Sequence, residues 1–177
     1  MKRIIITLFF SGISGIAIGV ALGIFIYPYW FLNDIANEQL QMPARQISLS
    51  NGVFIHAQPN DPVHWGKGRV RLYRDNNGKT VVFLDKDFEV GPGPRFHVYL
   101  ADNAAIRNND DFKTAKSLDL GRLRAFRGSQ IYRVPAGTDV AAYQSVVIWC
   151  KEFGVLISPA TLANLKTSAL TPVHFEG

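Results

Sequence analysis

The N-terminal stretch from Ile4 to Leu32 contains no charged residue, and only Met1, Lys2 and Arg3 precede it. A helix that crosses the hydrocarbon core of a bilayer needs ~20 predominantly apolar residues. Because the uncharged stretch exceeds that length, the sequence predicts a transmembrane signal anchor over residues 1–32 and a separate folded domain after it.

A cleaved signal peptide is the alternative interpretation of this stretch. The apolar region of such a peptide is ~7–15 residues long and ends at small residues, whereas this run is longer and ends in bulky aromatic residues. We therefore favour an uncleaved anchor. Lys2 and Arg3 place the N-terminus in the cytoplasm by the positive-inside rule. The expected location is the cell (inner) membrane, single-pass, with residues 33–177 extracytoplasmic or periplasmic.

Small residues recur at every fourth position of the expected anchor. Ser11, Gly15, Gly19 and Gly23 share one helix face, in the small-xxx-small pattern that lets two transmembrane helices approach closely. Helix–helix self-association, or pairing with a partner helix, is one interpretation. A plain anchor is the other, since glycine is common in membrane helices.

Beyond a polar juxtamembrane linker over residues 33–46, short apolar segments alternate with turn residues. The expected strands are Ile47–Ser50, Val53–Ala57, Gly68–Arg74, Thr80–Leu84, Arg95–Leu100, Lys116–Leu120, Gln130–Val134, Ser145–Cys150 and Gly154–Ser158. Such spacing with little helical periodicity is typical of an all-β fold. We predict an antiparallel β-sandwich or barrel-like domain over residues 47–165 and a tail over residues 166–177.

Turn signals separate the expected strands. Asn51-Gly52 and the stretch Asp75–Gly78 both indicate hairpins. Gly91–Pro94 predicts a loop, because two prolines and two glycines cannot sustain a strand ladder. We also expect a surface loop over residues 101–111 and a brief helix within Thr138–Tyr143.

Two strands carry alternating patterns with a structural meaning. In Arg95–Leu100 every second residue is apolar, which predicts a half-buried strand with His97 on the solvent side. Asp85, Asp87 and Glu89 alternate in the same way, and we interpret them as a solvated edge that blocks strand-to-strand aggregation.

Composition and motifs narrow the functional classes. The net charge of +5 comes from scattered Lys and Arg residues, without a basic arm or an aromatic platform, so no nucleic-acid partner is expected. No Ser-His-Asp, HExxH or paired-carboxylate motif supports hydrolytic catalysis. Whether the chain is an enzyme stays open, with a redox role as the candidate.

Cys150 is the only cysteine. A lone thiol cannot form an internal disulfide, so in an oxidising compartment it stays free, pairs with another molecule or holds a ligand. Strand alternation places Cys150 on one side with Val146 and Ile148. Since Lys151 and Glu152 follow at once, we expect the thiol to be partly exposed. A buried thiol that fills core volume is the alternative.

Several blocks in order resemble the DM13 domain of bacterial membrane-anchored and animal extracellular proteins, over about residues 47–165. The blocks are His64–Gly68, Leu84–Phe88, Gly93–Leu100, Leu120–Leu123, Gly128–Tyr132, Val146–Phe153 and Ala160–Leu162. The resemblance implies a β-fold redox module built around its cysteine, here Cys150. Electrons would be carried by the bare thiol or by a bound prosthetic group such as haem.

The histidines are candidate partners of Cys150 in holding such a group. His64 lies in a block that matches the family, whereas His97 qualifies only if it faces the same cavity as Cys150. Haem would take a thiolate or a histidine as its axial ligand. A blue-copper site is not expected, because no nearby His–Met pair follows the cysteine. We assign no metal.

The leading hypothesis is a membrane-anchored, extracytoplasmic electron-transfer module that uses Cys150, with a redox partner protein that the sequence does not identify. The alternative is a non-redox β-sandwich that binds a partner protein or a small ligand, with Cys150 in its core. A third hypothesis, a covalent dimer through Cys150, requires an exposed thiol.

Overall fold

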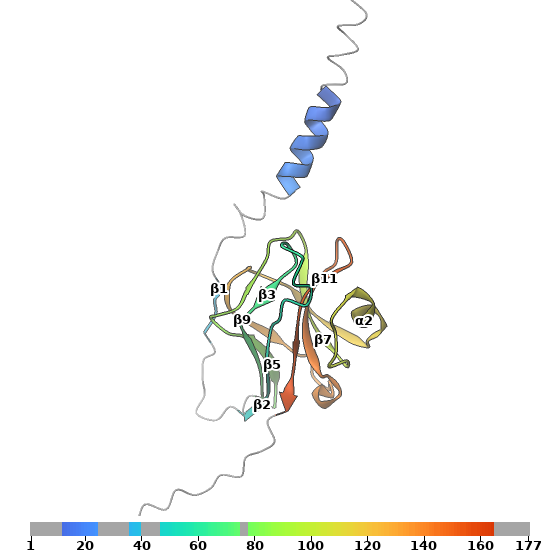
Figure 1. Cartoon of the computed structure of the whole chain (residues 1–177). Helices are drawn as coiled ribbons and strands as arrows, with labels where there is room; N and C mark the ends of the chain where they lie inside the picture. The colour runs from blue at the N-terminus through green and yellow to red at the C-terminus, as the bar shows by residue number, and fades with distance from the viewer. Residues whose placement is uncertain (1–11, 25–35, 40–46, 75–77, 165–177) are drawn as a thin grey trace, which may run out of the picture.

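The computed structural model describes residues 12–24, 36–39, 47–74 and 78–164 (Figure 1). Residues 12–24 are helical, and the β domain follows them. Within these described residues, no helix has both the length and the apolar character that crossing a membrane requires. The expected anchor extends beyond this helix in both directions, and the expected tail over residues 166–177 also lies outside the described residues.

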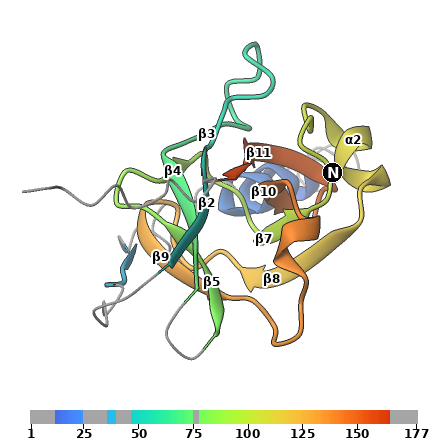
Figure 2. The same ribbon diagram turned by 90° about the horizontal axis from the view of Figure 1, so that it is seen from below.

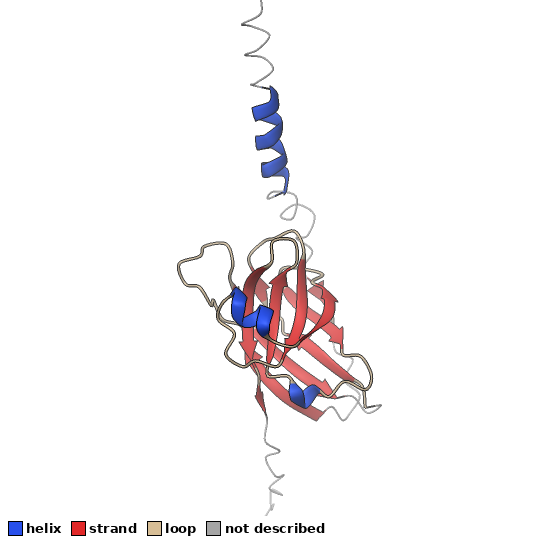
Figure 3. Ribbon diagram, turned by 90° about the vertical axis from the view of Figure 1, so that its right-hand side faces the viewer, coloured by secondary structure: helices blue, strands red, loops and turns tan. Residues whose placement is uncertain are grey.

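Two main sheets form the β domain, as the views in Figures 2 and 3 show. The first has the strand order β1-β9-β5-β4-β2-β12 and the second the order β11-β10-β7-β8, while β3 and β6 form a small third sheet. The strands are β1 (Ala36–Asn37), β2 (Ile47–Val53), β3 (Gly66–Lys67), β4 (Arg69–Arg74), β5 (Thr80–Leu84), β6 (Glu89–Val90), β7 (Phe96–Ala101), β8 (Ser117–Arg122), β9 (Gly128–Arg133), β10 (Ser145–Cys150), β11 (Val155–Thr161) and β12 (Ala163–Asn164). The prediction of a mostly antiparallel β-sandwich is confirmed, but the sheets do not close into a barrel.

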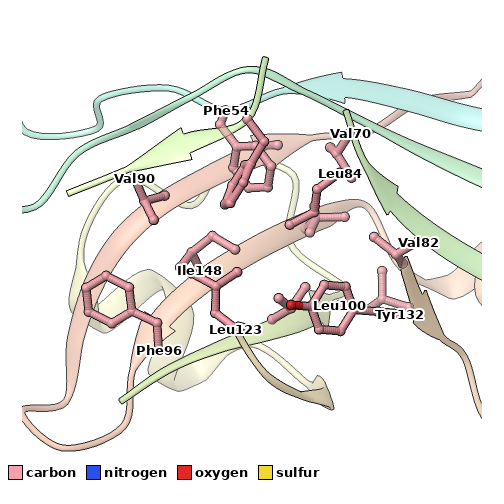
Figure 4. Packing of buried hydrophobic residues seen from close by; sticks show 14 of the residues in the cluster. Phe54, Val70, Val82, Leu84, Val90, Phe96, Leu100, Leu123, Tyr132 and Ile148 are labelled. Carbon is pink, nitrogen blue, oxygen red and sulfur yellow. The ribbon is translucent and has the colours of Figure 1, made fainter. Parts of the chain in front are cut away.

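The hydrophobic core lies between the two main sheets (Figure 4). Strand alternation turns every second side chain inward. Val82 and Leu84 therefore enter the core from β5, while Val98 and Leu100 enter it from β7. The brief helix expected within Thr138–Tyr143 is the 3₁₀ helix η1 (Val140–Ala142), and Asp139 caps its N-terminus.

The first hairpin expected from the sequence is absent. Asn51 and Gly52 lie inside β2, where they pair with Arg71 and Val70 of β4. A Cβ at Gly52 would approach the carbonyl oxygen of Thr161 to 2.6 Å. A glycine is therefore needed at position 52 because two backbones pass close together there, and not because the chain turns. The second hairpin is confirmed by the antiparallel pairing of β4 with β5, although turn residues 75–77 lie outside the described residues.

The outer face of the four-stranded sheet is covered, so β7 is not half-buried as predicted. Helix α2 (Asn109–Thr114) begins within the stretch expected to be a surface loop, and Asn108 caps it. The ring of Phe112 packs on Trp149 at 4.5 Å and on Tyr99 at 5.2 Å between ring centroids. Ile106 from the same region is fully buried. A second, smaller core therefore lies outside this sheet.

Part of the expected linker is bound to the domain. β1 pairs in parallel with β9 at the edge of the six-stranded sheet. Glu38 accepts a hydrogen bond from the backbone N–H of Ile131 at 2.8 Å and pairs with Arg124 at 2.7 Å. The chain between the N-terminal helix and β2 is thus fixed to the domain at residues 36–38.

The alternating acidic residues Asp85, Asp87 and Glu89 do not form the solvated strand edge that the sequence predicted. Asp85 is 2 % exposed and pairs with Arg71 at 2.5 Å. Asp87 pairs with Arg69, and Glu89 pairs with Lys67 and with Arg127. The prediction was wrong at Asp85, because neighbouring arginines neutralise a carboxylate that the sheet buries.

Candidate functional site

Cys150 is the last residue of β10, so it lies at one end of the sandwich. It lies opposite Phe96 of β7 and Val155 of β11 in the two strand registers. The side chain faces the inter-sheet core with Ile148, as the alternation predicted, but it is only 1 % exposed. The expectation of a partly exposed thiol is therefore wrong. The covalent-dimer hypothesis lacks the exposed sulfur that it requires.

A cavity of about 250 Å³ lies beside Cys150 at this end of the sandwich. Its apolar lining comes from Val63, Pro92, Pro94, Phe96, Phe153 and Val155. Ile24, the last described residue of the N-terminal helix, also contributes. Cys150 and His64 are the two lining residues whose side chains carry a polar or sulfur atom. The structure therefore brings these two sequence-predicted site residues to one apolar cavity.

His64 is held in place by Asp61, a residue that the sequence analysis did not select. One Asp61 carboxylate oxygen accepts hydrogen bonds from the backbone N–H groups of Val63 and His64. The other lies 2.6 Å from Nδ1 of the His64 ring. The backbone N–H of His64 and then its side chain lower the pKa of Asp61 to about 2. Asp61 is therefore ionised at neutral pH and accepts the proton of Nδ1.

His56 supports the same loop from outside the cavity. Its Nε2 lies 2.7 Å from the backbone oxygen of Asp61, and the residue is exposed. His56 is not among the residues that line the cavity.

His97 does not meet Cys150. It lies opposite Trp149 in the pairing of β7 with β10, so it projects from the sheet face opposite Cys150. Nδ1 of His97 lies 3.0 Å from both carboxylate oxygens of Asp119, which also pairs with Lys151 at 3.1 Å. Burial opposes the ionisation of Asp119, but hydrogen bonds from His97, from the N–H of Gly121 and from Lys151 lower its pKa overall.

Residues Gly91–Pro94 form a loop, as the sequence predicted. This loop closes one side of the cavity. A Cβ at Gly93 would lie 2.2 Å from the ring of Phe96, and one at Gly91 would lie 2.3 Å from the backbone oxygen of Val63. The glycines thus let this loop pack against the Phe96 ring and the segment that carries His64. The prolines supply apolar surface without backbone N–H groups.

The size of the cavity argues against haem. Sites for drug-sized ligands and cofactors are ~300–1,000 Å³, and this cavity of about 250 Å³ lies below that range, so it suits a ligand smaller than a haem macrocycle. Within the described ranges, no group of three or more His, Cys, Asp or Glu residues is placed to hold a metal ion. These residues fit a bare thiol or one small apolar ring better than a large prosthetic group.

The fold and the site define a class of protein: an antiparallel β-sandwich with a thiol and an imidazole at an apolar cavity near one end. The sequence profile of the DM13 family, described as electron transfer DM13, matches residues 59–162. The chain therefore belongs to the DM13 family, which suggests a redox-related role. Searches of curated proteins and of solved structures each found no match.

Proposed function

We propose that this protein is a membrane-anchored, extracytoplasmic electron-transfer module in which the sulfur of Cys150 is the redox group. The observation that carries the proposal is the position of Cys150, buried to 1 % exposure yet beside a cavity that His64 also lines. A sulfur that only fills core volume needs no cavity next to it and no imidazole on that cavity. Membership of the DM13 family supports the redox character.

A balanced one-electron step is available at this site. The S–H bond of Cys150 breaks, one electron passes to a one-electron acceptor protein docked at this end of the sandwich, and the proton leaves through the cavity to solvent. A thiyl radical is left, and the reverse step restores the thiol.

Disulfide exchange with a partner protein is a poorer fit to the burial of Cys150. A disulfide needs the two sulfurs ~2.05 Å apart. A sulfur that is 1 % exposed does not admit a protein cysteine to that distance without movement of the surrounding loops. Electron transfer needs no such contact.

The membrane location rests on the apolar N-terminal stretch. Within the described helix at residues 12–24, the exposed large apolar side chains are Ile13, Ile16, Ile18, Val20, Leu22 and Ile24. Exposed apolar surface on this scale favours cover by lipid or by another protein. At Gly15, Gly19 and Gly23 nothing lies within 4 Å of a built Cβ. These positions are thus free for the proposed helix–helix self-association.

Voltammetry of the full chain in detergent micelles on a carbon electrode tests the redox role. We expect a reversible one-electron wave whose potential falls by about 59 mV per pH unit, because one proton leaves with each electron. Cys150→Ala should abolish the wave. The control His97→Ala, on the opposite sheet face, should retain it. A wave that persists in Cys150→Ala would contradict the proposal.

A non-redox binding module is the second candidate, and the complete burial of Cys150 in the inter-sheet core favours it. Under this alternative the folded wild-type chain gives no wave at any pH. Cys150→Ala then changes only stability, by the modest cost of a small loss of core volume. The same voltammetric experiment therefore separates the two candidates.

A further inference from the structure

The end cavity has the dimensions and lining of a site for one aromatic ring. An apolar cavity of ~150 Å³ in another protein binds benzene, so about 250 Å³ leaves room for a single ring with small substituents. The ring of Phe96 and the two prolines of the Gly91–Pro94 loop supply flat apolar surface. Among the described residues, no lysine or arginine lines the cavity, which argues against phosphate or carboxylate ligands.

The one nitrogen-bearing side chain of this lining has a defined hydrogen-bonding role. Because the Asp61 carboxylate only accepts hydrogen bonds, Nδ1 of His64 carries the ring proton. In the neutral imidazole, Nε2 is then an acceptor. Among the described residues, Nε2 of His64 meets no hydrogen-bond donor. The cavity therefore favours a ligand that donates a hydrogen bond, such as an aromatic hydroxyl.

The cavity lies beside the apolar end of the chain. Ile24 lines it, so the path of the chain from the uncharged N-terminal stretch passes this site. If that stretch is a membrane anchor, ligands that partition into lipid reach the cavity at high local concentration. Among carriers of electrons without metal, hydroxylated single rings that dissolve in lipid are the quinols.

We propose that the end cavity binds the ring of a quinol, with one ring hydroxyl donating a hydrogen bond to Nε2 of His64 and the ring packed against Phe96. This inference rests on the proposed redox function and deepens it by naming a ligand class. It concerns binding alone. The quinone form has no hydroxyl, so it loses this hydrogen bond and binds more weakly.

Calorimetric titration of the full chain in detergent micelles, without oxygen, tests the inference. The ligands are tetramethylhydroquinone and tetramethyl-1,4-benzoquinone, whose rings are fully substituted and so resist addition of the thiol. We expect the quinol to bind about threefold to tenfold more tightly, the value of one net hydrogen bond. His64→Ala should remove this preference, and the control His97→Ala, on the opposite sheet face, should retain it.

A second variant checks the place of binding. Val155→Phe fills the cavity and should weaken both ligands at least tenfold, while circular dichroism reports that the chain stays folded. Equal affinity for the two ligands, no binding, or a quinol preference that survives His64→Ala would each overturn the inference. Calorimetry reads the preference without any redox step, whereas voltammetry reads the redox role, so failure of the redox proposal and failure of quinol binding are distinguishable.

Discussion

Asp61 is the residue that determines how the imidazole of the site is presented. It fixes the loop through two backbone N–H groups and holds Nδ1 of His64 at 2.6 Å. An ionised carboxylate makes stronger hydrogen bonds than a neutral one. Protonation of Asp61 would therefore loosen the loop and free the His64 ring at the same time.

The lowered pKa of Asp61 predicts a specific loss of stability in acid. The pKa is about 2 in the folded chain and near its ordinary 3.8 in the unfolded chain. The stabilisation is thus complete above pH ~4 and is lost as the pH falls through about 2. We expect Asp61→Asn to lower the free energy of unfolding at pH 7 by about 1–2 kcal/mol, allowing for partial exposure of the carboxylate.

Urea unfolding at pH 7, 4, 3 and 2 measures this effect. The difference between wild type and Asp61→Asn should shrink between pH 4 and pH 2, since the wild-type carboxylate becomes protonated there. Asp110→Asn, which changes an exposed carboxylate in α2, serves as the control and should show no such trend. A constant difference across this pH range would mean that Asp61 acts through shape and not through charge.

At the scale of residues, the sequence predicted which sheet face a side chain points to better than it predicted which other parts of the chain cover that side chain. Period-two alternation correctly placed Cys150 inward and His97 on the opposite face. It could not predict the burial of the thiol, because the loops that cover the end of β10 come from distant parts of the chain. Asp61 was missed although it lies three positions before His64, a spacing at which a loop carboxylate can hold a histidine.

At the scale of elements, β2 shows how a tertiary contact overrides a local turn signal. Asn-Gly favours a two-residue hairpin only where both flanking segments can pair with each other. Here β2 pairs instead along β4, while β11 and β12 pass close to it. The glycine is explained by the carbonyl of Thr161, which no local pattern reveals. Helix α2 was missed for a related reason, since it is short and polar apart from Phe112.

The contact at Gly52 predicts that replacing this glycine lowers the free energy of unfolding, which is the opposite of the usual effect in a strand. Alanine in a strand interior normally stabilises by about 0.5–1 kcal/mol relative to glycine. At Gly52 the added Cβ would meet the backbone oxygen of Thr161 at 2.6 Å, so β11 must shift. We expect Gly52→Ala to destabilise the domain by about 1–3 kcal/mol, the usual cost of overpacking.

The neighbouring exposed residue provides the control for this substitution. Asn51→Ala changes the same strand without adding volume to the contact, so it should alter the free energy of unfolding by less than about 0.5 kcal/mol. Both variants are compared with wild type by urea unfolding. A Gly52→Ala variant as stable as wild type would mean that β2 and β11 separate without cost.

At the scale of the whole molecule, the N-terminal helix lies beyond one end of the sandwich (Figure 1), and the site lies at that end because Ile24 of the helix lines its cavity. Ile24 reaches the cavity lining, and Glu38 binds the following chain to β9 through Ile131 and to Arg124. The sequence predicted the β class. It did not predict that residues 36–38 join the domain, because a two-residue strand has no periodicity to detect.

This arrangement would give the proposed anchor a role in function, since it would hold the cavity close to lipid. We predict that the full chain stays in the membrane fraction after an alkaline carbonate wash. The double substitution Ile16→Lys and Val20→Lys should release it, because each charge near the middle of an anchor costs ~2.5–3.5 kcal/mol on insertion. The double substitution Ile16→Leu and Val20→Leu keeps the apolar character and should stay bound. Release of the wild type by carbonate, or retention of the lysine variant, would show that the N-terminal stretch binds a protein surface and not the bilayer.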